Sequence, residues 1–226
     1  MDKHPQEKQP RTVPIFGTVY GTLLNTKAEI ASLGPALSAA PYNAPPKAPI
    51  LYIKPPGTWR LTDGTVRLPR GADTVEVSAT MGVVIGRPAT RVAEASAFDH
   101  VAGYIAAIDI CLPHKDYYRP SVKERCRDGF LPIASRMTAR ENLPDPNHIA
   151  VRTLVNGEEK GCFSTLELVR PIAKLMADVT DFMTLYEGDV LLVGLTPERP
   201  LAHSGDIVTA SVTGMDTVEV QIGSAK

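Results

Sequence analysis

The chain has 226 residues, of which 43% are hydrophobic and 22% are charged, a balance typical of a folded globular protein rather than a disordered one. Its 24 Lys and Arg residues and 25 Asp and Glu residues give a formal net charge of −1, without the basic excess that nucleic-acid binders usually need. No apolar run approaches the ~20 residues that span a bilayer, and residues 1–12 lack the apolar core of a secretory signal. We therefore expect a cytoplasmic protein with neither a nucleic-acid nor a membrane partner.

Breaker residues and cysteines restrict the fold class further. The 20 prolines and 17 glycines argue against a helical bundle and indicate many short strands joined by turns. The 3 cysteines form no CxxC pair, and an odd count leaves one unpaired, so we expect reduced, buried or half-buried thiols. Cys126 lies between Arg125 and Arg127, although Asp128 follows, so its thiol is kept only as a candidate nucleophile.

The first quarter of the chain predicts a leader, a strand, a helix and a loop in that order. Residues 1–12 are polar and predict a flexible leader. β-branched and aromatic residues predict a strand over 13–24, and helical composition follows over 26–39. Prolines crowd residues 40–49 and predict an extended loop, after which a short strand is expected at 50–53.

The segment 74–85 carries the clearest strand pattern. Its odd positions are all apolar, whereas its even positions include Glu76, Ser78 and Thr80. A period of two places these sets on opposite faces of a sheet, so the odd face belongs to the core. The even face fits either an ordinary half-exposed strand, which the pattern alone favours, or the floor of a pocket.

A lone acid interrupts the apolar segment 104–112, which follows a predicted short helix at 92–101. Asp109 is unusual in such a run because burying an unpaired charge is costly. Two interpretations remain open. Asp109 is either a structural acid bonded to backbone amides or a member of a functional site.

The last third of the chain predicts a hairpin, a helix and three strands. Asn156-Gly157 separates two strand-like segments, and this dipeptide favours the two-residue turn of a β-hairpin. Residues 164–167 resemble a capping box, with a helix and a late start or kink expected at Pro171. The predicted apolar stripe of that helix comprises Leu166, Val169, Ala173, Met176 and Phe182. The further strands are expected at 190–195, 207–213 and 218–222.

These elements predict a mainly β protein of the α+β class, folded as a single domain over residues 13–226. The sequence contains no GxGxxG, P-loop, HExxH or GxSxG motif, and its 5 histidines are scattered. The residues by themselves therefore indicate only a strand-rich domain with a possible pocket near Ser78, Thr80 and Asp109.

Several longer motifs resemble a known family. The fumarylacetoacetate hydrolase family is resembled by KPPGT at 54–58, VVIGR at 83–87, DHVAGYIAAID at 99–109 and FMTLYEGDVLLVG at 182–194. A narrower resemblance is to the amino-terminal half of the bifunctional isomerases/decarboxylases of 4-hydroxyphenylacetate (homoprotocatechuate) degradation. It is carried by GTVYGTLLN at 17–25, YNAPPKAPILYIKP at 42–55 and YYRPSVKERCRDGFLPI at 117–133.

The resemblance implies a fold, a reaction and an assembly. The fold would be a mixed β-sandwich roll with a few short helices. The implied reactions are decarboxylation of 5-oxopent-3-ene-1,2,5-tricarboxylate and isomerisation of 2-hydroxyhepta-2,4-diene-1,7-dioate, so the ligands would be dicarboxylate or tricarboxylate 2-oxo acids. The chain would be a separately encoded subunit. It would assemble either as a homodimer or as a heteromer with a homologous metal-binding subunit.

The same resemblance implies Mg²⁺ or Mn²⁺, because a hard cation stabilises the enolate of a 2-oxo acid. The family places Glu-x-Glu before VVIG and an Asp on the following strand. In this sequence these positions hold Ser78, Thr80 and Asp109. Glu76 shares their face but lies ~7 Å further along the strand, too far to replace a ligand without a bulge. One carboxylate in place of three predicts an absent or weakly bound cation.

The resemblance also implies catalytic and substrate-binding positions. The proton-handling pair of the family falls on Glu29 and Ser32, with Lys27 nearby, although a solvated helix residue is the favoured interpretation of Glu29. The family holds substrate carboxylates with basic and hydroxyl side chains, a role that falls here on Lys54, Arg119, Arg125 and Thr196. Arg125 replaces a lysine of the family and changes its geometry, and Leu195 is an insertion beside Thr196.

Four functions remain open from the sequence. The chain is an isomerase/decarboxylase subunit that acts with a metal-binding homologue, or a non-catalytic structural subunit, or a metal-free catalyst that uses Glu29, Arg119 and Arg125. A hydrolase of acylpyruvates is ranked last because it would need both the metal and the general base. The joint loss of the carboxylates and the proton-handling pair favours a subunit whose partner performs the chemistry.

Overall fold

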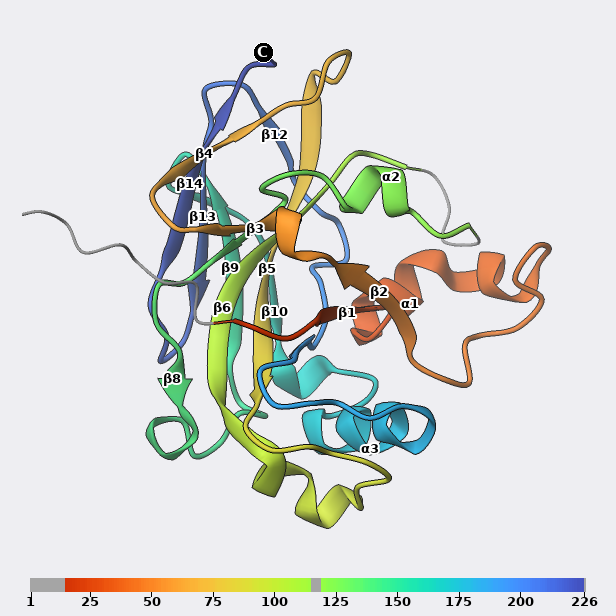
Figure 1. Ribbon diagram of the computed structural model, residues 1–226. Coiled ribbons are helices and arrows are strands. Elements are labelled where there is room, and N and C mark those ends of the chain that lie inside the picture. The colour runs from red at the N-terminus through yellow and green to blue at the C-terminus, as the bar shows by residue number, and fades with distance from the viewer. Residues whose placement is uncertain (1–14, 115–118, 226) are drawn as a thin grey trace, which may run out of the picture.

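Two β-sheets pack against each other in the computed structural model, which describes residues 15–114 and 119–225 (Figure 1). The leader predicted at residues 1–12 lies outside the described residues. A single cluster of buried apolar side chains draws on both sheets, with Val77, Ile108, Val151 and Val208 among its members. The predicted mainly β architecture with a few short helices is therefore confirmed.

The larger sheet carries the strands that the sequence analysis singled out. Its path runs β2 (Ile50–Lys54), β1 (Val19–Leu23), β11 (Val190–Leu192), β5 (Thr74–Ile85), β6 (Val101–Cys111), β7 (Leu131–Ile133) and β3 (Trp59–Leu61). Two short strands join it off this path, β12 (Leu201–His203) on β5 and β8 (Thr138–Ala139) on β6. Because β1 pairs with β11 and β3 with β7 in parallel, the sheet is mixed.

The smaller sheet contains the predicted hairpin. Its order is β10 (Glu158–Ser164), β9 (Ala150–Val155), β13 (Ile207–Val212), β14 (Val218–Gly223) and β4 (Gly64–Arg67). Asn156 and Gly157 join β9 to β10 with φ values of 53° and 81°, the left-handed conformation that the dipeptide predicted.

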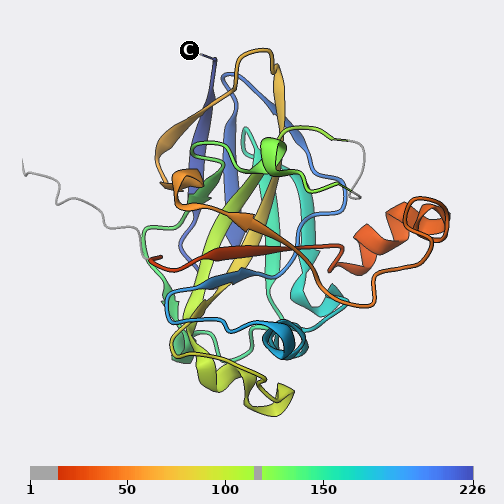
Figure 2. The ribbon, with the colours of Figure 1, turned by 45° about the vertical axis from the view of Figure 1, so that its right-hand side comes forward.

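The helices are short and flank the larger sheet. They are α1 (Lys27–Leu33), α2 (Val122–Arg125) and α3 (Ile172–Phe182), with 3₁₀ turns η1 (Gly34–Ser38), η2 (Pro56–Thr58), η3 (Glu94–His100), η4 (Arg140–Asn142) and η5 (Thr165–Glu167). Figure 2 shows α1 and η1 projecting from the body, whereas α3 is seen nearly end-on. In the described part of the chain, every helix is too short or too polar to cross a membrane.

Several predicted boundaries need correction. The helix predicted at 26–39 divides into α1 and η1, and the one at 92–101 is the 3₁₀ turn η3. The capping box of Ser164 forms, but it caps only η5, because Pro171 delays α3 to Ile172. Leu166 and Val169 therefore precede α3. These two residues and Phe182, at the end of α3, are exposed, so the predicted stripe is wrong at these three positions.

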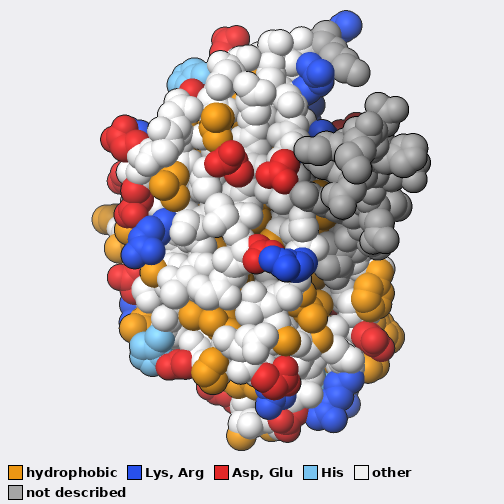
Figure 3. Space-filling view, turned by 90° about the vertical axis from the view of Figure 1, so that its left-hand side faces the viewer, with side chains coloured by type: hydrophobic (Ala, Val, Ile, Leu, Met, Phe, Trp, Pro, Cys, Tyr) orange, Lys and Arg blue, Asp and Glu red, His pale blue; other side chains and the backbone are white. Residues whose placement is uncertain are grey.

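The surface reflects the balanced charge of the chain. Figure 3 shows acidic and basic side chains interspersed on one face of the molecule.

All 3 cysteines are free. Cys111 is buried and Cys126 is half-buried, whereas Cys162 is exposed, contrary to the prediction of buried or half-buried thiols.

Candidate functional site

The site predicted from the polar face of 74–85 is formed where β5 pairs with β6. Ser78 lies directly opposite Asp109, and Thr80 lies opposite Ala107 two residues along. Ser78, Thr80 and Asp109 are all fully buried. The favoured interpretation of an ordinary half-exposed strand is therefore wrong, because only Thr74 and Glu76 on this face keep partial exposure. The alternation of residue types along the strand could not predict the burial of this face, because the segments that cover it are distant in sequence.

Asp109 is the centre of a buried charge network. Its Oδ1 accepts a hydrogen bond from Arg125 Nη1 at 2.9 Å. Its Oδ2 accepts from the Tyr52 hydroxyl at 2.7 Å and lies 3.3 Å from Lys54 Nζ. Both oxygens are thus bonded inside the protein, which stabilises a carboxylate that would otherwise be costly to bury. Asp109 therefore pairs with cationic side chains.

Lys54 is held by backbone carbonyls as well as by Asp109. Its ammonium donates to the carbonyl oxygens of Ile110, Arg125 and Phe130 at 2.8, 3.1 and 3.0 Å. Burial lowers the pKa of Lys54, and the nearby Asp109 carboxylate acts in the opposite direction. Because an ammonium has three donors, this set leaves none for a ligand. The geometry thus argues against the substrate-binding role expected of Lys54.

Arg125 joins the network to a neighbouring cavity. Its Nε donates to Ser121 Oγ at 3.1 Å, and its guanidinium carbon lies 4.5 Å from the centroid of the Tyr52 ring. Burial lowers the pKa of Arg125, but Asp109 together with Tyr52 and Cys111 outweighs this effect and holds the pKa above its usual value. Its Nη2 is buried and has no hydrogen-bond partner among the described residues. Arg125 therefore keeps donor capacity at the edge of a cavity.

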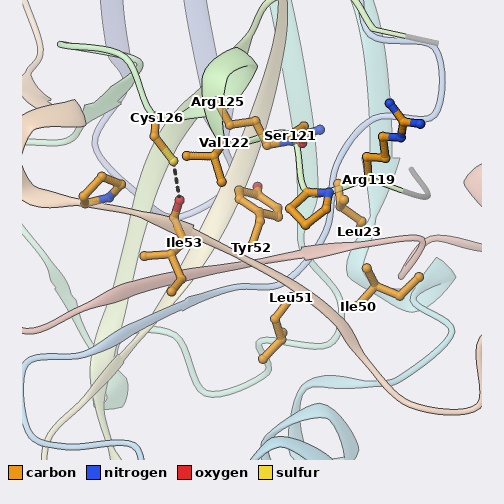
Figure 4. A pocket seen from close by; sticks show the side chains of 12 residues that line it. Leu23, Ile50, Leu51, Tyr52, Ile53, Arg119, Ser121, Val122, Arg125 and Cys126 are labelled. Carbon is orange, nitrogen blue, oxygen red and sulfur yellow. Dashed lines mark hydrogen bonds between the residues drawn. The ribbon is translucent and has the colours of Figure 1, made fainter. Parts of the chain in front are cut away.

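A cavity of about 530 Å³ lies between β2 and the segment around α2. Figure 4 shows Tyr52, Val122 and Arg125 in its wall, with Arg119 at one side. Two of the predicted substrate-binding residues, Arg119 and Arg125, therefore line one mainly apolar cavity, whereas Lys54 and Thr196 do not. Cys126 also lines it, but its Sγ donates to the Ile53 carbonyl at 3.2 Å. Burial raises the pKa of Cys126, which disfavours the thiolate that a nucleophile requires.

Tyr52 is a site residue that the sequence analysis missed. It shares a face of β2 with Lys54, and this spacing of two was the available signal. Its ring lies across Gly21, where an added Cβ would fall 2.0 Å from Tyr52 Cζ. Burial and the adjacent Asp109 carboxylate raise the pKa of Tyr52 well above its usual value, so its hydroxyl remains a donor. Gly21 thus makes room for the bond between Tyr52 and Asp109.

Ser78 and Thr80 bind the segment that follows β11. Thr80 Oγ1 donates to the Gly194 carbonyl at 2.7 Å. Ser78 Oγ accepts from the Thr196 backbone N–H at 2.9 Å and lies 3.2 Å from Thr196 Oγ1. Thr196 is itself 3% exposed, so its predicted role in carboxylate binding has no open path in this structure. The two hydroxyls thus connect β5 to residues 194–196.

The residues at the implied cation position do not fit Mg²⁺ or Mn²⁺. These ions prefer several carboxylate and carbonyl oxygens, whereas Asp109 is the single carboxylate here and both its oxygens are bonded. The hydroxyls of Ser78 and Thr80 are neutral and already bonded to the chain. Glu76 lies opposite Cys111 rather than Asp109, two residues along β5 from Ser78. The geometry thus supports the expectation of a degenerate cation site.

Glu29 is buried, so its interpretation as a solvated helix residue is wrong. It is 1% exposed and forms a capping box with Thr26 at the start of α1. Thr26 Oγ1 contacts the Leu195 carbonyl at 3.4 Å, which holds this end of α1 against the segment after β11. Burial raises the pKa of Glu29 to about 7, while the Arg199 charge opposes that rise. Its Oε1 has no hydrogen-bond partner among the described residues.

The other member of the implied proton-handling pair has a local role. Ser32 Oγ donates to the Glu29 backbone carbonyl at 2.9 Å, within the same helix. Arg199 was not predicted, and its loop position carries no periodic signal that would reveal it. Its charge nevertheless acts on Glu29, Tyr52 and Arg125. The site therefore combines three buried cationic side chains with Asp109, Glu76 and Glu29.

Comparison with known proteins gives relatives that match nearly the whole chain. The chain is 33% identical over 203 residues to the 4-hydroxyphenylacetate degradation bifunctional isomerase/decarboxylase of Salmonella dublin. That match covers 90% of this chain and 46% of the relative. The chain thus spans about half the length of the curated relatives that it matches first.

Solved structures share the fold. The 5-carboxymethyl-2-hydroxymuconate delta-isomerase from Mycobacterium smegmatis is 26% identical, with a TM-score of 0.78 over 94% of this chain and 80% of that one. Fumarylpyruvate hydrolase from Pseudomonas aeruginosa, solved with Mn²⁺ and pyruvate, is 19% identical with a TM-score of 0.77 over 91% of this chain and 89% of that one, a likeness of fold alone. The family described as fumarylacetoacetate (FAA) hydrolase C-terminal matches residues 18–223. The resemblance of the sequence motifs is thereby confirmed, and the chain belongs to the fumarylacetoacetate hydrolase family.

Proposed function

We propose that this chain is a subunit of the 2-hydroxyhepta-2,4-diene-1,7-dioate isomerase/5-oxopent-3-ene-1,2,5-tricarboxylate decarboxylase of 4-hydroxyphenylacetate catabolism, and that it does not bind the catalytic cation. A homologous subunit with the carboxylate ligands performs the metal-dependent chemistry. The proposal rests on one observation. Asp109, at the implied cation position, has both oxygens bonded to Tyr52, Lys54 and Arg125 inside the protein.

The arrangement of the neighbouring residues supports a structural role for this pocket. Lys54 uses its ammonium on backbone carbonyls, and Ser78 and Thr80 bind the segment 194–196. Each interaction stabilises the chain rather than leaving a donor for a 2-oxo acid. The match covers 46% of a bifunctional relative, which leaves room in that protein for a second unit.

Assembly of such a subunit requires apolar surface. Several large apolar side chains are exposed, among them Phe16, Val122, Phe182 and Tyr186, at 72%, 62%, 62% and 63%. Exposed apolar surface is commonly covered in oligomers. We expect a homodimer when the chain is expressed alone and a heteromer with the cation-binding homologue. A stable monomer in light scattering at micromolar concentration contradicts this expectation.

The decisive experiment follows the diene absorbance of 2-hydroxyhepta-2,4-diene-1,7-dioate in the presence of Mg²⁺. The chain alone, a homologous subunit with the Glu-x-Glu motif alone, and their mixture are compared at equal concentrations. We expect no turnover by this chain and a faster reaction in the mixture than with the homologue alone. Absence of both a complex and a rate increase would refute the proposal.

A second function is favoured by two specific observations. Glu29 has a pKa of about 7, suited to proton transfer near neutral pH, and Arg125 keeps an unbonded Nη2 at the cavity. These groups would support a metal-free isomerisation of an oxo acid. Saturable turnover by the chain alone in the presence of a chelator, lost in Glu29→Gln and in Arg125→Lys, selects this function instead.

A further inference from the structure

A second cluster of potential ligands lies one row away from Asp109 on the same face of the sheet. Cys111 follows Asp109 by two residues on β6, and Glu76 lies directly opposite Cys111 on β5. His114 follows β6 and brings its ring back to the strand. The ligand atoms of Glu76, Cys111 and His114 all lie within 4.8 Å of one another, the one such group of three among the described residues.

The spacing of these atoms suits a tetrahedral ion. Zinc bonds of ~2.3 Å to sulfur and ~2.05 Å to nitrogen, at a tetrahedral angle, separate the two ligand atoms by ~3.6 Å. Cys111 Sγ and His114 Nδ1 are 3.5 Å apart. The strand pairing holds Glu76 and Cys111 side by side.

The chemistry of the ligands differs from that of the degenerate site. A thiol, an imidazole and a carboxylate are ligands that Zn²⁺ accepts together, whereas Mg²⁺ and Mn²⁺ favour oxygen. The thiolate of Cys111 is the form that binds a metal, so coordination replaces the thiol proton. One proton therefore leaves Cys111 for each ion bound.

Arg199 supports the site rather than excluding an ion. Its Nε donates to Glu76 Oε2 at 2.7 Å, and coordination would use the other carboxylate oxygen, Oε1. Ligating carboxylates commonly accept such a hydrogen bond, which fixes their orientation. Because Glu76 is only 16% exposed in its side chain and Cys111 is fully buried, the ligands are largely shielded from water.

We propose that Glu76, Cys111 and His114 form a zinc site, with water as the fourth ligand. The site is separate from the cation position of the family and independent of the subunit role proposed above. It takes a borderline-soft divalent ion, Zn²⁺ in preference to Mg²⁺ or Mn²⁺.

The test uses the untagged full chain, reduced and freed of metal by a chelator. Equilibrium dialysis against Zn²⁺ with elemental analysis measures the stoichiometry, and competition with a chromogenic chelator measures the affinity. Co²⁺ as a spectroscopic substitute reports thiolate ligation through its sulfur-to-metal charge-transfer absorption. We expect about one zinc per chain and this absorption band.

Variants identify the ligands. Because loss of an outer-shell partner weakens metal binding 10–100-fold, we expect Cys111→Ser and His114→Ala to weaken it by ~100-fold or more. Cys162→Ser and His148→Ala replace exposed residues and should leave it unchanged. If buried Cys111→Ser fails to fold, His114→Ala and Glu76→Gln still decide the matter. The proposal would be overturned if the wild-type chain held zinc only at background level. It would also be overturned if His114→Ala bound zinc as tightly as the wild type, since Cys111 and His114 would then form a thiol–imidazole contact only.

Discussion

Replacing Glu29 by glutamine tests whether the buried carboxylate of Glu29 lowers the stability of the folded protein. Gln keeps the shape of the side chain and serves as well as Glu at the third position of a capping box, so the bond to Thr26 can persist. Gln does not titrate. The variant therefore removes the ionisation of this group while the rest of α1 remains the same.

The expected change in the free energy of unfolding follows from the pKa values of the Glu29 carboxyl in the folded and unfolded states. The folded pKa of Glu29 is about 7, against a usual value of 4.5. Each tenfold change in proton affinity is worth ~1.4 kcal/mol, so the ionised carboxylate lowers the free energy of unfolding by ~3 kcal/mol. Below pH 4.5 both states are protonated and this loss is absent. As the pH rises from 4.5 to about 7, the unfolded state ionises first and stability is lost.

The assay is urea unfolding of both proteins at fixed concentration across this pH range. The difference in free energy of unfolding, Glu29→Gln minus wild type, should rise by ~3 kcal/mol between about pH 4.5 and 7 and then level off. A constant offset from the new amide does not alter this rise. Glu167→Gln, in the exposed capping box of η5, is the matched control and should show no comparable rise. A pH-independent difference for Glu29→Gln would show that the Glu29 carboxyl has the same pKa in the folded and unfolded states.

Three further predictions concern the residues around Asp109. Lys54→Met leaves Asp109 without one of its buried partners and should lower the free energy of unfolding by ~3–5 kcal/mol, measured by urea titration, and a loss below ~1 kcal/mol would contradict the network. Thr80→Val keeps the volume but leaves the Gly194 carbonyl without its donor, so we expect a loss of ~1–3 kcal/mol, whereas an unchanged denaturation midpoint would exclude the bond. Elemental analysis after dialysis against Mn²⁺ should find no stoichiometric ion that depends on Asp109, and a full equivalent lost in Asp109→Asn would reverse this conclusion.

Local patterns were enough to predict part of this protein. The alternation over 74–85 predicted β5 with its bounds, because a period of two is a property of the strand itself. Asn156-Gly157 predicted the hairpin through its backbone preference. Asp109 stood out in the sequence because an acid in an apolar run is costly to bury. Family motifs then placed Ser78 and Thr80 beside it, and the strand register agrees.

Tertiary structure alone decided what these residues do. Tyr52 and Lys54 reach Asp109 from a strand more than fifty residues away, and only the folded sheet determines that both oxygens of Asp109 are bonded. Glu29 has the composition of a solvated helix residue. It is buried at the end of α1 that contacts Leu195 through Thr26, and burial is the largest cause of its raised pKa. Desolvation depends on everything that surrounds a group in three dimensions, so no local pattern could have predicted it.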